Sequence, residues 1–478
     1  MLRLLGQAEY GLYGIANSIM GYIGLLNFGI GGTIVRYLSK YRAEGDREQE
    51  ARVVGLFLKI YSVVCVLILT AGFVFAANVE VYSRSLLPDE VGTLRILVIL
   101  MTLNTAIFLP FGVFNSIVIA YERYIFSKLV GVLATVLAPV LHLILLYMGY
   151  GSVGLVLGST LLNVVTYGLY AWYALGRLRI RPSFKSAGKG LLREILKFSA
   201  FVFLASIVDT LYWTTDKLII GWAKGTKDTA VYNIGGTFNT YVTGLSSAIS
   251  GLLIPKLTQM SVKNAPKEEF TRIFIKVGRL QFLIVSFIVS AFVAFGRQFI
   301  ALWAGPEYRL SYYVALLTMI PVTIPLIQNT GLNILYALNR HQFRSAVYAC
   351  IAAVNVVLTF WWVESYGIIG AALATCIAYV VGNILIINWY YHVKIGIDIP
   401  LFWKHILKMS PVMFVMGTAA WFVVERLPMD NWLVFFGAAA VYTVVYSLMA
   451  YFFMMNSYEK DIVRAPLKKV LRKLKLLK

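Results

Sequence analysis

The sequence predicts an all-α polytopic membrane protein, made of two parallel six-helix repeats followed by two further C-terminal helices. Three observations predict this fold class: an apolar composition, long apolar runs along the whole chain, and an internal repeat. Of the 478 residues, 59% are hydrophobic and only 14% are charged, and the mean hydropathy is +0.76. Soluble domains are about 45–50% apolar and about 25% charged, so this composition excludes a soluble globular chain.

Long apolar runs recur from one end of the chain to the other. Each is close to the roughly 18–25 residues that a helix needs to cross a bilayer. Their length, and the lack of short alternating segments, favours helices over a β-barrel. We count thirteen such runs and predict a helix for each: residues 10–35, 53–76, 96–120, 127–148, 153–175, 195–222, 230–255, 271–295, 311–338, 343–363, 367–391, 404–424 and 432–454.

The positive charge of the chain follows these predicted crossings. A net charge of +21 would suggest nucleic-acid binding in a soluble protein. Here one set of alternate loops, together with the C-terminal tail, carries roughly four times as many Lys and Arg residues as the opposite set. This distribution is the positive-inside pattern. We therefore expect a multi-pass protein of the inner (cytoplasmic) cell membrane with a cytoplasmic C-terminus, and no nucleic-acid partner.

The two halves of the chain resemble each other. The matches, in chain order, are residues 13–50 with 232–269, 121–128 with 338–345, and 150–154 with 366–370. The repeat unit holds six helices, and an even number gives both copies the same orientation in the membrane. The second copy begins with the helix at 195–222, whose counterpart would lie before Met1. We therefore expect that the first helix is absent from the given chain, through a misassigned start or a real truncation.

The repeat and the loop charges divide the chain into five parts. They are an N-terminal lobe at 1–176 with helices 2–6 of the repeat, a cytoplasmic inter-lobe linker at 177–194, a C-terminal lobe at 195–391, two additional transmembrane helices at 392–454, and a basic tail at 455–478. Apolar residues of the tail fall on one helical stripe between basic residues. This pattern predicts a cytoplasmic amphipathic helix on anionic lipid, and a solvated basic tail is the alternative.

The predicted helix at 195–222 carries Asp209, Asp216 and Lys217 within its apolar sequence. A charge within a membrane helix costs several kcal/mol and usually faces the bundle interior or a water-filled cavity. Asp209 and Asp216 are seven residues apart, so they share a helix face, roughly 10 Å apart along the axis. We predict all three as substrate-binding residues. The alternatives are a buried carboxyl that holds another helix (Asp209), a cap (Asp216) and snorkelling to lipid headgroups (Lys217).

A second group of candidate substrate-binding residues lies at the predicted cytoplasmic side. Arg36 ends the first visible helix, and Lys59 lies about two turns into the next one. In the second repeat, Lys256 and Arg279 are immediate neighbours of the equivalent positions. Each lobe would then present two cations at nearly equal depth, which suits a diphosphate headgroup. The alternative is that these residues only anchor the topology as positive-inside charges.

The start of the chain resembles a known family. From Arg3 it reads RLLGQAEYGLYGIANSIMGYIGLLNFGIGGTIVRYLSKYRAEGD, which is similar to the opening of the bacterial polysaccharide-export (Wzx-like) flippases, the polysaccharide transporter branch of the MOP superfamily. The segment TTDKLIIGWAKGTKDTAVYNIG, from Thr214, resembles the seventh helix and following loop of that family. The resemblance covers nearly the whole chain, except for the first helix that precedes the RLLG motif. It implies two six-helix lobes around a central cavity, and movement of an undecaprenyl-diphosphate-linked oligosaccharide across the inner membrane.

The sequence lacks the motifs that would indicate several other classes of function. It has no Walker A motif, so the chain is not expected to hydrolyse ATP. It has no Cys/His cluster with metal-ligand spacing, and no cofactor or metal is expected. The longest predicted outer loops, about 77–95 and 296–310, are short and lack histidine, which disfavours an enzyme.

We therefore predict a flippase that moves a lipid-linked oligosaccharide by alternating access for polysaccharide export. Its expected partners are that substrate and membrane lipid, with a coupling cation (H+ or Na+) and other polysaccharide-assembly proteins as further candidates. A cation-coupled drug exporter or a lipid II flippase of the same fold is the first alternative. A membrane-embedded glycan polymerase or ligase is the more distant alternative. The surplus of cations near the predicted cavity favours an anionic cargo over a cationic drug.

Overall fold

The computed structural model describes residues 2–462 and Arg464, apart from residues 29, 83, 187–189, 251–256, 258, 261, 262, 264, 339, 341 and 430. The predicted amphipathic helix of the tail therefore falls almost wholly outside the described residues. Within them the chain is helical, without a β-strand, so the all-α prediction is confirmed.

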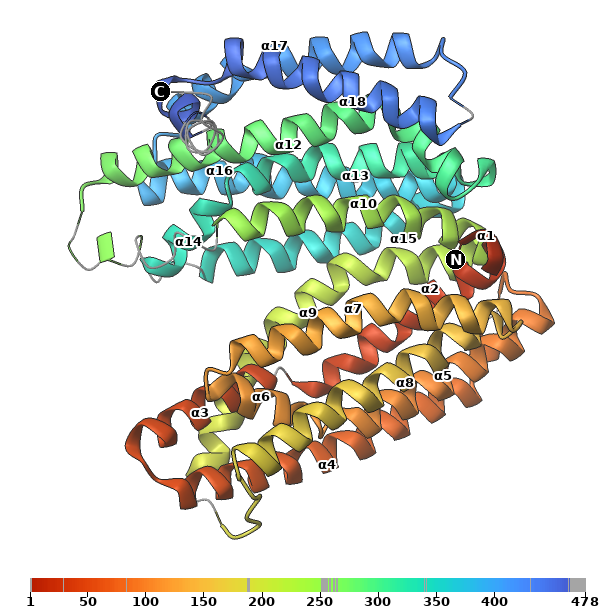
Figure 1. The fold of residues 1–478 in the computed structure, drawn as a ribbon, viewed down its shortest axis with the longest axis vertical. Helices are drawn as coiled ribbons and strands as arrows, with labels where there is room; N and C mark the ends of the chain where they lie inside the picture. The colour runs from red at the N-terminus through yellow and green to blue at the C-terminus, as the bar shows by residue number, and fades with distance from the viewer. Residues whose placement is uncertain are drawn as a thin grey trace, which may run out of the picture. The chain divides into compact units, whose positions relative to one another are not determined.

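The main helices follow one another through short connections (Figure 1). They are α1 (Leu2–Leu5), α2 (Gln7–Gly24), α3 (Ile30–Glu44), α4 (Arg47–Ala77), α5 (Pro88–Phe108), α6 (Gly112–Ala120), α7 (Tyr124–Tyr147), α8 (Gly151–Trp172), α9 (Leu191–Lys224), α10 (Thr226–Ser250), α12 (Lys267–Trp303), α13 (Leu310–Ile327), α14 (Asn329–Ala337), α15 (Gln342–Tyr379), α16 (Ile387–Tyr390), α17 (Ile399–Val424) and α18 (Trp432–Met449). Four π-helical segments continue or join them: η3 (Tyr173–Arg177), η6 (Val380–Ile386), η7 (Tyr391–Ile395) and η8 (Ala450–Met454).

Ten helices among the described residues are long and apolar enough to cross a membrane. One of them, Gln342–Ile395, contains two of the predicted runs, and its backbone leaves helical geometry at Gly367 (φ 59°), where the second of these runs begins. The predicted runs at 195–222 and 230–255 form the long helices α9 and α10, which are not among the ten. The polytopic membrane fold is thus confirmed, while the full set of thirteen crossings stays a prediction.

Two predicted runs are each divided into a long and a short helix. The run at 96–120 forms α5 and α6, which are separated at Leu109–Phe111, where Pro110 cannot donate a backbone hydrogen bond. The run at 311–338 forms α13 and α14, with Gln328 between them. The hydropathy of the sequence indicates one apolar run in each case, because a break between two apolar helices does not change the amino-acid composition of the run.

The chain folds into two compact units. The first comprises Met1–Asn233 with Val356–Ala371, and the second comprises Ile234–Asn355 with Ala372–Lys478. In the first unit α7 packs along α8, α5 packs between α4 and α8, and α2 packs on α5 and α9 (Figure 1). In the second unit α12 is the central helix, which packs against α13, α17 and α18. The predicted linker and lobe boundaries stay predictions.

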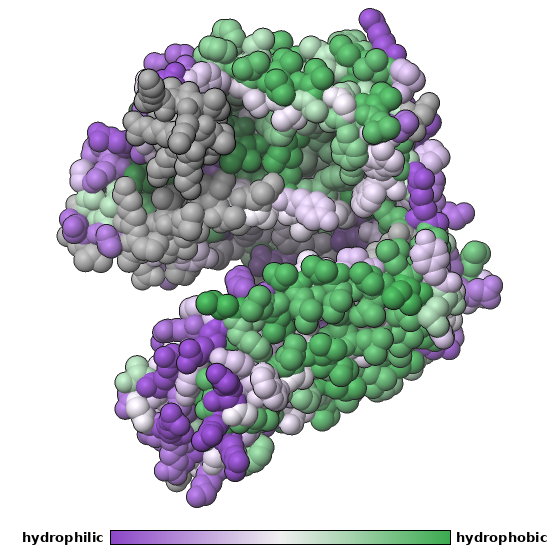
Figure 2. Space-filling view, in the orientation of Figure 1, coloured by the Kyte–Doolittle hydropathy of each residue, from purple (hydrophilic) through white to green (hydrophobic). Residues whose placement is uncertain are grey.

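Apolar side chains cover one face of the first unit. Helix α7 is the least buried of the ten candidate spans. Figure 2 shows this surface as a continuous apolar area, with hydrophilic residues gathered at one end of the unit. The exposed side chains on α7 include Leu129, Val132, Val136, Val140 and Ile144. A large exposed apolar face with polar ends is the surface that a lipid bilayer covers.

Candidate functional site

Asp216 is a buried carboxylate that connects three helices. Its side chain is 3% exposed. The Tyr232 hydroxyl, on α10, donates to its Oδ2 over 2.6 Å, and the Thr359 hydroxyl, on α15, donates to its Oδ1 over 3.0 Å. Both carboxylate oxygens therefore accept a hydrogen bond, which offsets part of the cost of burial away from water.

The two remaining candidate residues of α9 have different surroundings. Asp209 has an exposed side chain, whereas Lys217 is half-buried one residue beyond Asp216. A hydrogen bond between the Tyr22 and Thr215 hydroxyls joins α9 to α2 one residue before Asp216. The structure thus brings Asp216 into a network of hydroxyl groups and leaves Asp209 exposed on the surface of the helix.

The two predicted cations of the first repeat lie on successive helices. Arg36 is exposed on α3, with its guanidinium carbon 6.0 Å from the centre of the Tyr37 ring. Lys59, on α4, donates from Nζ to the backbone carbonyl of Phe184 over 2.7 Å, and its ammonium lies 5.8 Å from the centre of the Phe184 ring. Lys59 therefore holds the segment that follows α8 against α4, a contact that the sequence did not predict.

Arg279 is the most fully paired of the predicted cations. Its side chain is 6% exposed, and its Nε and Nη2 donate to the two carboxylate oxygens of Glu459 over 2.7 and 2.8 Å. Nη2 also donates to the Met454 carbonyl over 2.9 Å. This bidentate pair ties α12 to the turn after η8. Its predicted companion, Lys256, lies outside the described residues.

The turn at Glu459 has the hydrogen bonds of a helix N-terminus. The Asn456 side chain accepts from the Glu459 backbone N–H, and the Glu459 carboxylate accepts from the Asn456 backbone N–H, both over 2.9 Å. This reciprocal arrangement is a capping box, and it fixes the start of the helical turn at residues 457–462. The Glu459 carboxylate is therefore held in place from both sides, by Arg279 and by its own backbone.

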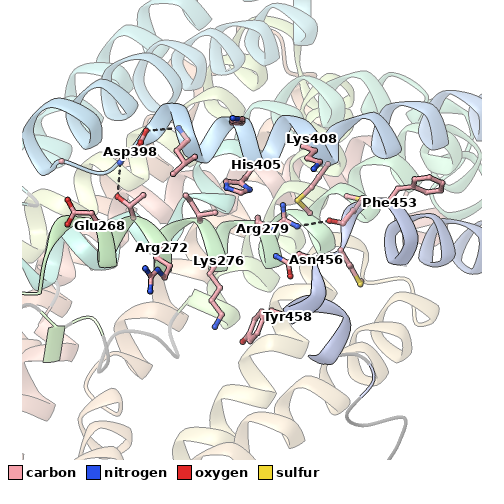
Figure 3. A pocket seen from close by; sticks show the side chains of 18 residues that line it. Glu268, Arg272, Lys276, Arg279, Asp398, His405, Lys408, Phe453, Asn456 and Tyr458 are labelled. Atoms are coloured by element: carbon pink, nitrogen blue, oxygen red, sulfur yellow. Dashed lines mark hydrogen bonds between the residues drawn. The ribbon is translucent and has the colours of Figure 1, made fainter.

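Arg279 lies on the wall of a large open cavity within the second unit, shown in Figure 3. The cavity has a volume of about 1130 Å³ and lies between the first half of α12, the first half of α17 and residues 453–458. Four further cations line it: Arg272, Lys276, Lys404 and Lys408. We call this cavity the basic cleft. Sequence reasoning counted these four residues only as positive-inside charges, although their i, i+4 spacing on two helices was a sign that each pair shares a face.

The residues that line the basic cleft suit the binding of an anion rather than of a metal cation. Glu268 and Asp398 are its acidic lining residues, and Asp398 caps α17 by accepting from the Leu401 N–H over 2.9 Å. Among the described residues no group of three or more His, Cys, Asp or Glu side chains could hold a metal ion. The lining of the cleft therefore holds more cationic than acidic side chains, which favours a negatively charged ligand.

Comparison with known proteins identifies the relatives of this chain. A family profile described as "Polysaccharide biosynthesis protein" matches residues 1–261. The "Putative O-antigen transporter" of Shigella flexneri is 20% identical over 403 residues, which cover 82% of this chain and 91% of that protein. The "Probable low-salt glycan biosynthesis flippase Agl15" of Haloferax volcanii is 22% identical over 43% of this chain and 42% of that protein.

Solved structures of similar fold are membrane transporters. "Lipid II flippase MurJ, inward closed conformation" superposes with a TM-score of 0.70 at 14% identity, over 93% of each chain. An inward-facing multidrug resistance MATE family transporter of the MOP superfamily gives a TM-score of 0.59 at 15% identity, over 80% of this chain and 93% of that one. At this identity the likeness concerns the fold alone, and it agrees with the predicted resemblance to the MOP superfamily. Because the family profile covers more than half of its length, the chain belongs to the polysaccharide biosynthesis protein family.

Proposed function

We propose that this protein flips a lipid-linked oligosaccharide across the cytoplasmic membrane for polysaccharide export. The observation that carries the proposal is the similarity to the Shigella flexneri protein, which spans 82% of this chain and 91% of that protein and whose name assigns it O-antigen as cargo. The expected carrier is undecaprenyl diphosphate. The proposed mechanism is alternating access, in which the binding residues open first to one side of the membrane and then to the other. A gradient of H+ or Na+ is the candidate source of direction.

The charged residues support an anionic cargo. The ammonium of Lys59 has three donor protons, and the Phe184 carbonyl accepts from it. Arg36 is exposed on α3. We propose that Arg36, Lys59 and Lys256 contact the diphosphate, and that Asp209 and Lys217 contact the sugars. Arg279 has both oxygens of Glu459 as partners, so we assign it to positioning the wall of the basic cleft.

A cation-coupled drug exporter of the same fold is the first alternative. The accessibility of the carboxylates on α9 distinguishes this alternative from the proposed flippase. A cationic drug needs a carboxylate that it can reach. Asp216 is buried and accepts from two hydroxyls, which leaves Asp209 as the exposed one of the two aspartates of α9. If the cargo is anionic, Asp209→Asn retains transport, because the amide can still form hydrogen bonds with a sugar, whereas a drug exporter would lose transport with the negative charge.

A lipid II flippase and a glycan-assembling enzyme differ from the proposal in chemistry. A lipid II flippase would carry the same diphosphate with a different headgroup, so competition between the two substrates distinguishes it. A glycan polymerase or ligase would need catalytic acids, Arg or His in a substantial outer loop. The connections between α4 and α5 (residues 78–87) and between α12 and α13 (residues 304–309) are short, which supports a transporter that is not an enzyme.

The proposal is tested by reconstitution of the full chain into liposomes. Undecaprenyl-diphosphate oligosaccharide with a fluorescent sugar is placed in both leaflets, and a membrane-impermeant quencher reports how much lies outside. We expect faster exchange between the leaflets than in liposomes with the heat-denatured protein. A Lys59→Gln variant should slow exchange, while Lys128→Gln, an exposed lysine at the start of α7, should not. Exchange equal to that of empty liposomes, with or without H+ and Na+ gradients, would contradict the proposal.

A further inference from the structure

The basic cleft contains more positive charge than its own residues neutralise. Among the described residues, no hydrogen bond or ion pair holds the side chain of Arg272, Lys404 or Lys408. The ammonium of Lys276 lies 3.6 Å from the centre of the Tyr458 ring, an aromatic contact without a counter-charge.

The spacing of these cations places like charges beside each other on two helices. Arg272 and Lys276 are four residues apart on α12, and Lys404 and Lys408 are four residues apart on α17. Like charges at this spacing repel each other on a helix face. Because all four residues line one cavity, the two pairs also add their positive potentials. An anionic group in the basic cleft would relieve both kinds of repulsion.

The wall of the basic cleft is preorganised. The Arg279–Glu459 pair and the capping box at Asn456 fix residues 454–459 against α12. At the opposite end, the Asp398 backbone N–H donates to the Thr271 hydroxyl over 3.1 Å, which fixes the start of α17 against α12. Figure 3 shows Asp398 and Phe453 toward opposite ends, with His405 and Arg279 between them. A ligand that enters therefore meets cations on two helices that are already held in position.

The position of the basic cleft relative to the membrane, and the residues that line it, indicate an amphiphilic ligand. Helix α12 has 37 residues, so it is about 55 Å long, while the hydrocarbon core of a bilayer is about 30 Å thick. In the predicted topology its first turns, which carry Arg272 and Lys276, form the end that extends to the cytoplasmic headgroup level. Phe453, which Figure 3 shows toward one end of the cleft, is 68% exposed, and Met455 also lines the cleft. Phosphate at the cationic walls and a hydrocarbon chain at this end would match both surfaces.

We propose that the basic cleft binds the phosphate-bearing headgroup of a membrane lipid. This inference goes beyond the proposed function, because it needs no transport of the bound lipid. Arg272, Lys276, Lys404 and Lys408 hold the phosphate oxygens, and Phe453 with Met455 contacts the first part of the hydrocarbon chain. Two lipids offer this chemistry, namely a bulk anionic phospholipid and a polyprenyl diphosphate, and the test distinguishes them.

The test measures lipid binding to the purified full chain by native mass spectrometry. The probes are phosphatidylglycerol, undecaprenyl diphosphate, phosphatidylcholine and inorganic pyrophosphate. We expect both anionic lipids to bind more tightly than phosphatidylcholine and pyrophosphate. The double variant Lys404→Gln/Lys408→Gln should weaken binding of the anionic lipids by about tenfold or more, because it removes two charge-assisted contacts. The lipid with the larger loss is the natural source of the headgroup.

A matched variant controls for total charge. Arg123→Gln/Lys128→Gln also removes two positive charges, from exposed residues at the start of α7 in the first unit, and should change binding by less than about twofold. Lys404→Arg/Lys408→Arg should restore binding. If the cleft variant does not fold, Arg272→Gln/Lys276→Gln replaces it. Equal losses in the cleft and control variants, unchanged binding in the cleft variant, or pyrophosphate that binds as tightly as the lipids would overturn the proposal.

Discussion

At the scale of single residues, two buried carboxylates determine where segments far apart in the sequence meet. Asp216 receives a hydrogen bond from Thr359, 143 residues away. Glu459 receives a bidentate pair from Arg279, 180 residues away. A carboxylate without partners is costly in a low-dielectric interior. Each of these residues therefore stabilises one arrangement of its neighbouring helices, apart from any contact with substrate.

The hydroxyl network predicts a structural role for Asp216. Asp216→Ala leaves the hydroxyls of Tyr232 and Thr359 without this acceptor, so the free energy of unfolding should fall by about 1–3 kcal/mol. The measurement is the thermal unfolding of the purified protein in detergent. The control is Asp461→Ala, at an exposed position, which should change the free energy of unfolding by about 0.5 kcal/mol or less. Equal effects of the two variants would contradict this role.

The buried ion pair predicts strongly non-additive mutations. Arg279→Ala leaves the Glu459 carboxylate, which is 2% exposed, without its guanidinium, and should lower the free energy of unfolding by about 3–5 kcal/mol. The double variant Arg279→Ala/Glu459→Ala should lose less than the sum of the two single variants. A double-mutant cycle from denaturant unfolding measures this coupling. Additive losses would show that the pair does not act as a unit.

At the scale of helices and loops, corresponding elements of the two predicted repeats have similar features. A long helix, a short helix and another long helix follow one another as α5, α6 and α7, and again as α13, α14 and α15. Phe126 stacks on Tyr173 with ring centroids 4.2 Å apart, and Phe343 stacks on Tyr390 at the same distance. The six-helix repeat stays a prediction. If it is correct, the two halves should show correspondences of this kind.

The close approach of the Ser183 carbonyl to Gly55 predicts that the segment after α8 packs against α4. The Cβ of an alanine at position 55 would clash with the Ser183 carbonyl oxygen. Gly55→Ala should therefore displace this segment, disrupt the contact between Lys59 and Phe184, and increase protease cleavage within residues 177–194. Gly131→Ala, on α7 with nothing within 4 Å of its Cβ, should leave cleavage unchanged, and should be neutral or stabilising by up to about 1 kcal/mol. Equal cleavage of both variants would contradict the contact.

The sequence predicts helices well and their breaks and contacts poorly. Hydropathy depends on composition, so it finds the apolar run at 96–120 but not the separation of α5 from α6 within it. Charge counting finds Arg272 and Lys404 but cannot show that they line one cavity, because that depends on how α12 packs against α17. Asp216 was recognised from its charge within a helix, whereas Tyr232 and Thr359 look like ordinary polar residues until the fold places them beside it.

At the scale of the whole molecule, the loop charges predict the orientation in the membrane. The end that carries most Lys and Arg residues, including the basic cleft and the tail, should be cytoplasmic. Green fluorescent protein fused after Lys478 should therefore fluoresce, and alkaline phosphatase at the same position should be inactive. A fusion within residues 304–309, on the opposite side, should give the reverse pattern. The same pattern at both positions would contradict the predicted topology.

The most direct test of the proposed function is the location of the lipid-linked oligosaccharide in cells that lack this protein. Spheroplasts are treated with a membrane-impermeant reagent that modifies only glycan on the outer surface of the cytoplasmic membrane. We predict that deletion leaves the lipid-linked oligosaccharide unmodified and accumulated on the cytoplasmic side, and that expression of the intact chain restores modification. Lipid-linked oligosaccharide that is already outside and unpolymerised in the deletion strain would contradict flipping and indicate a later step.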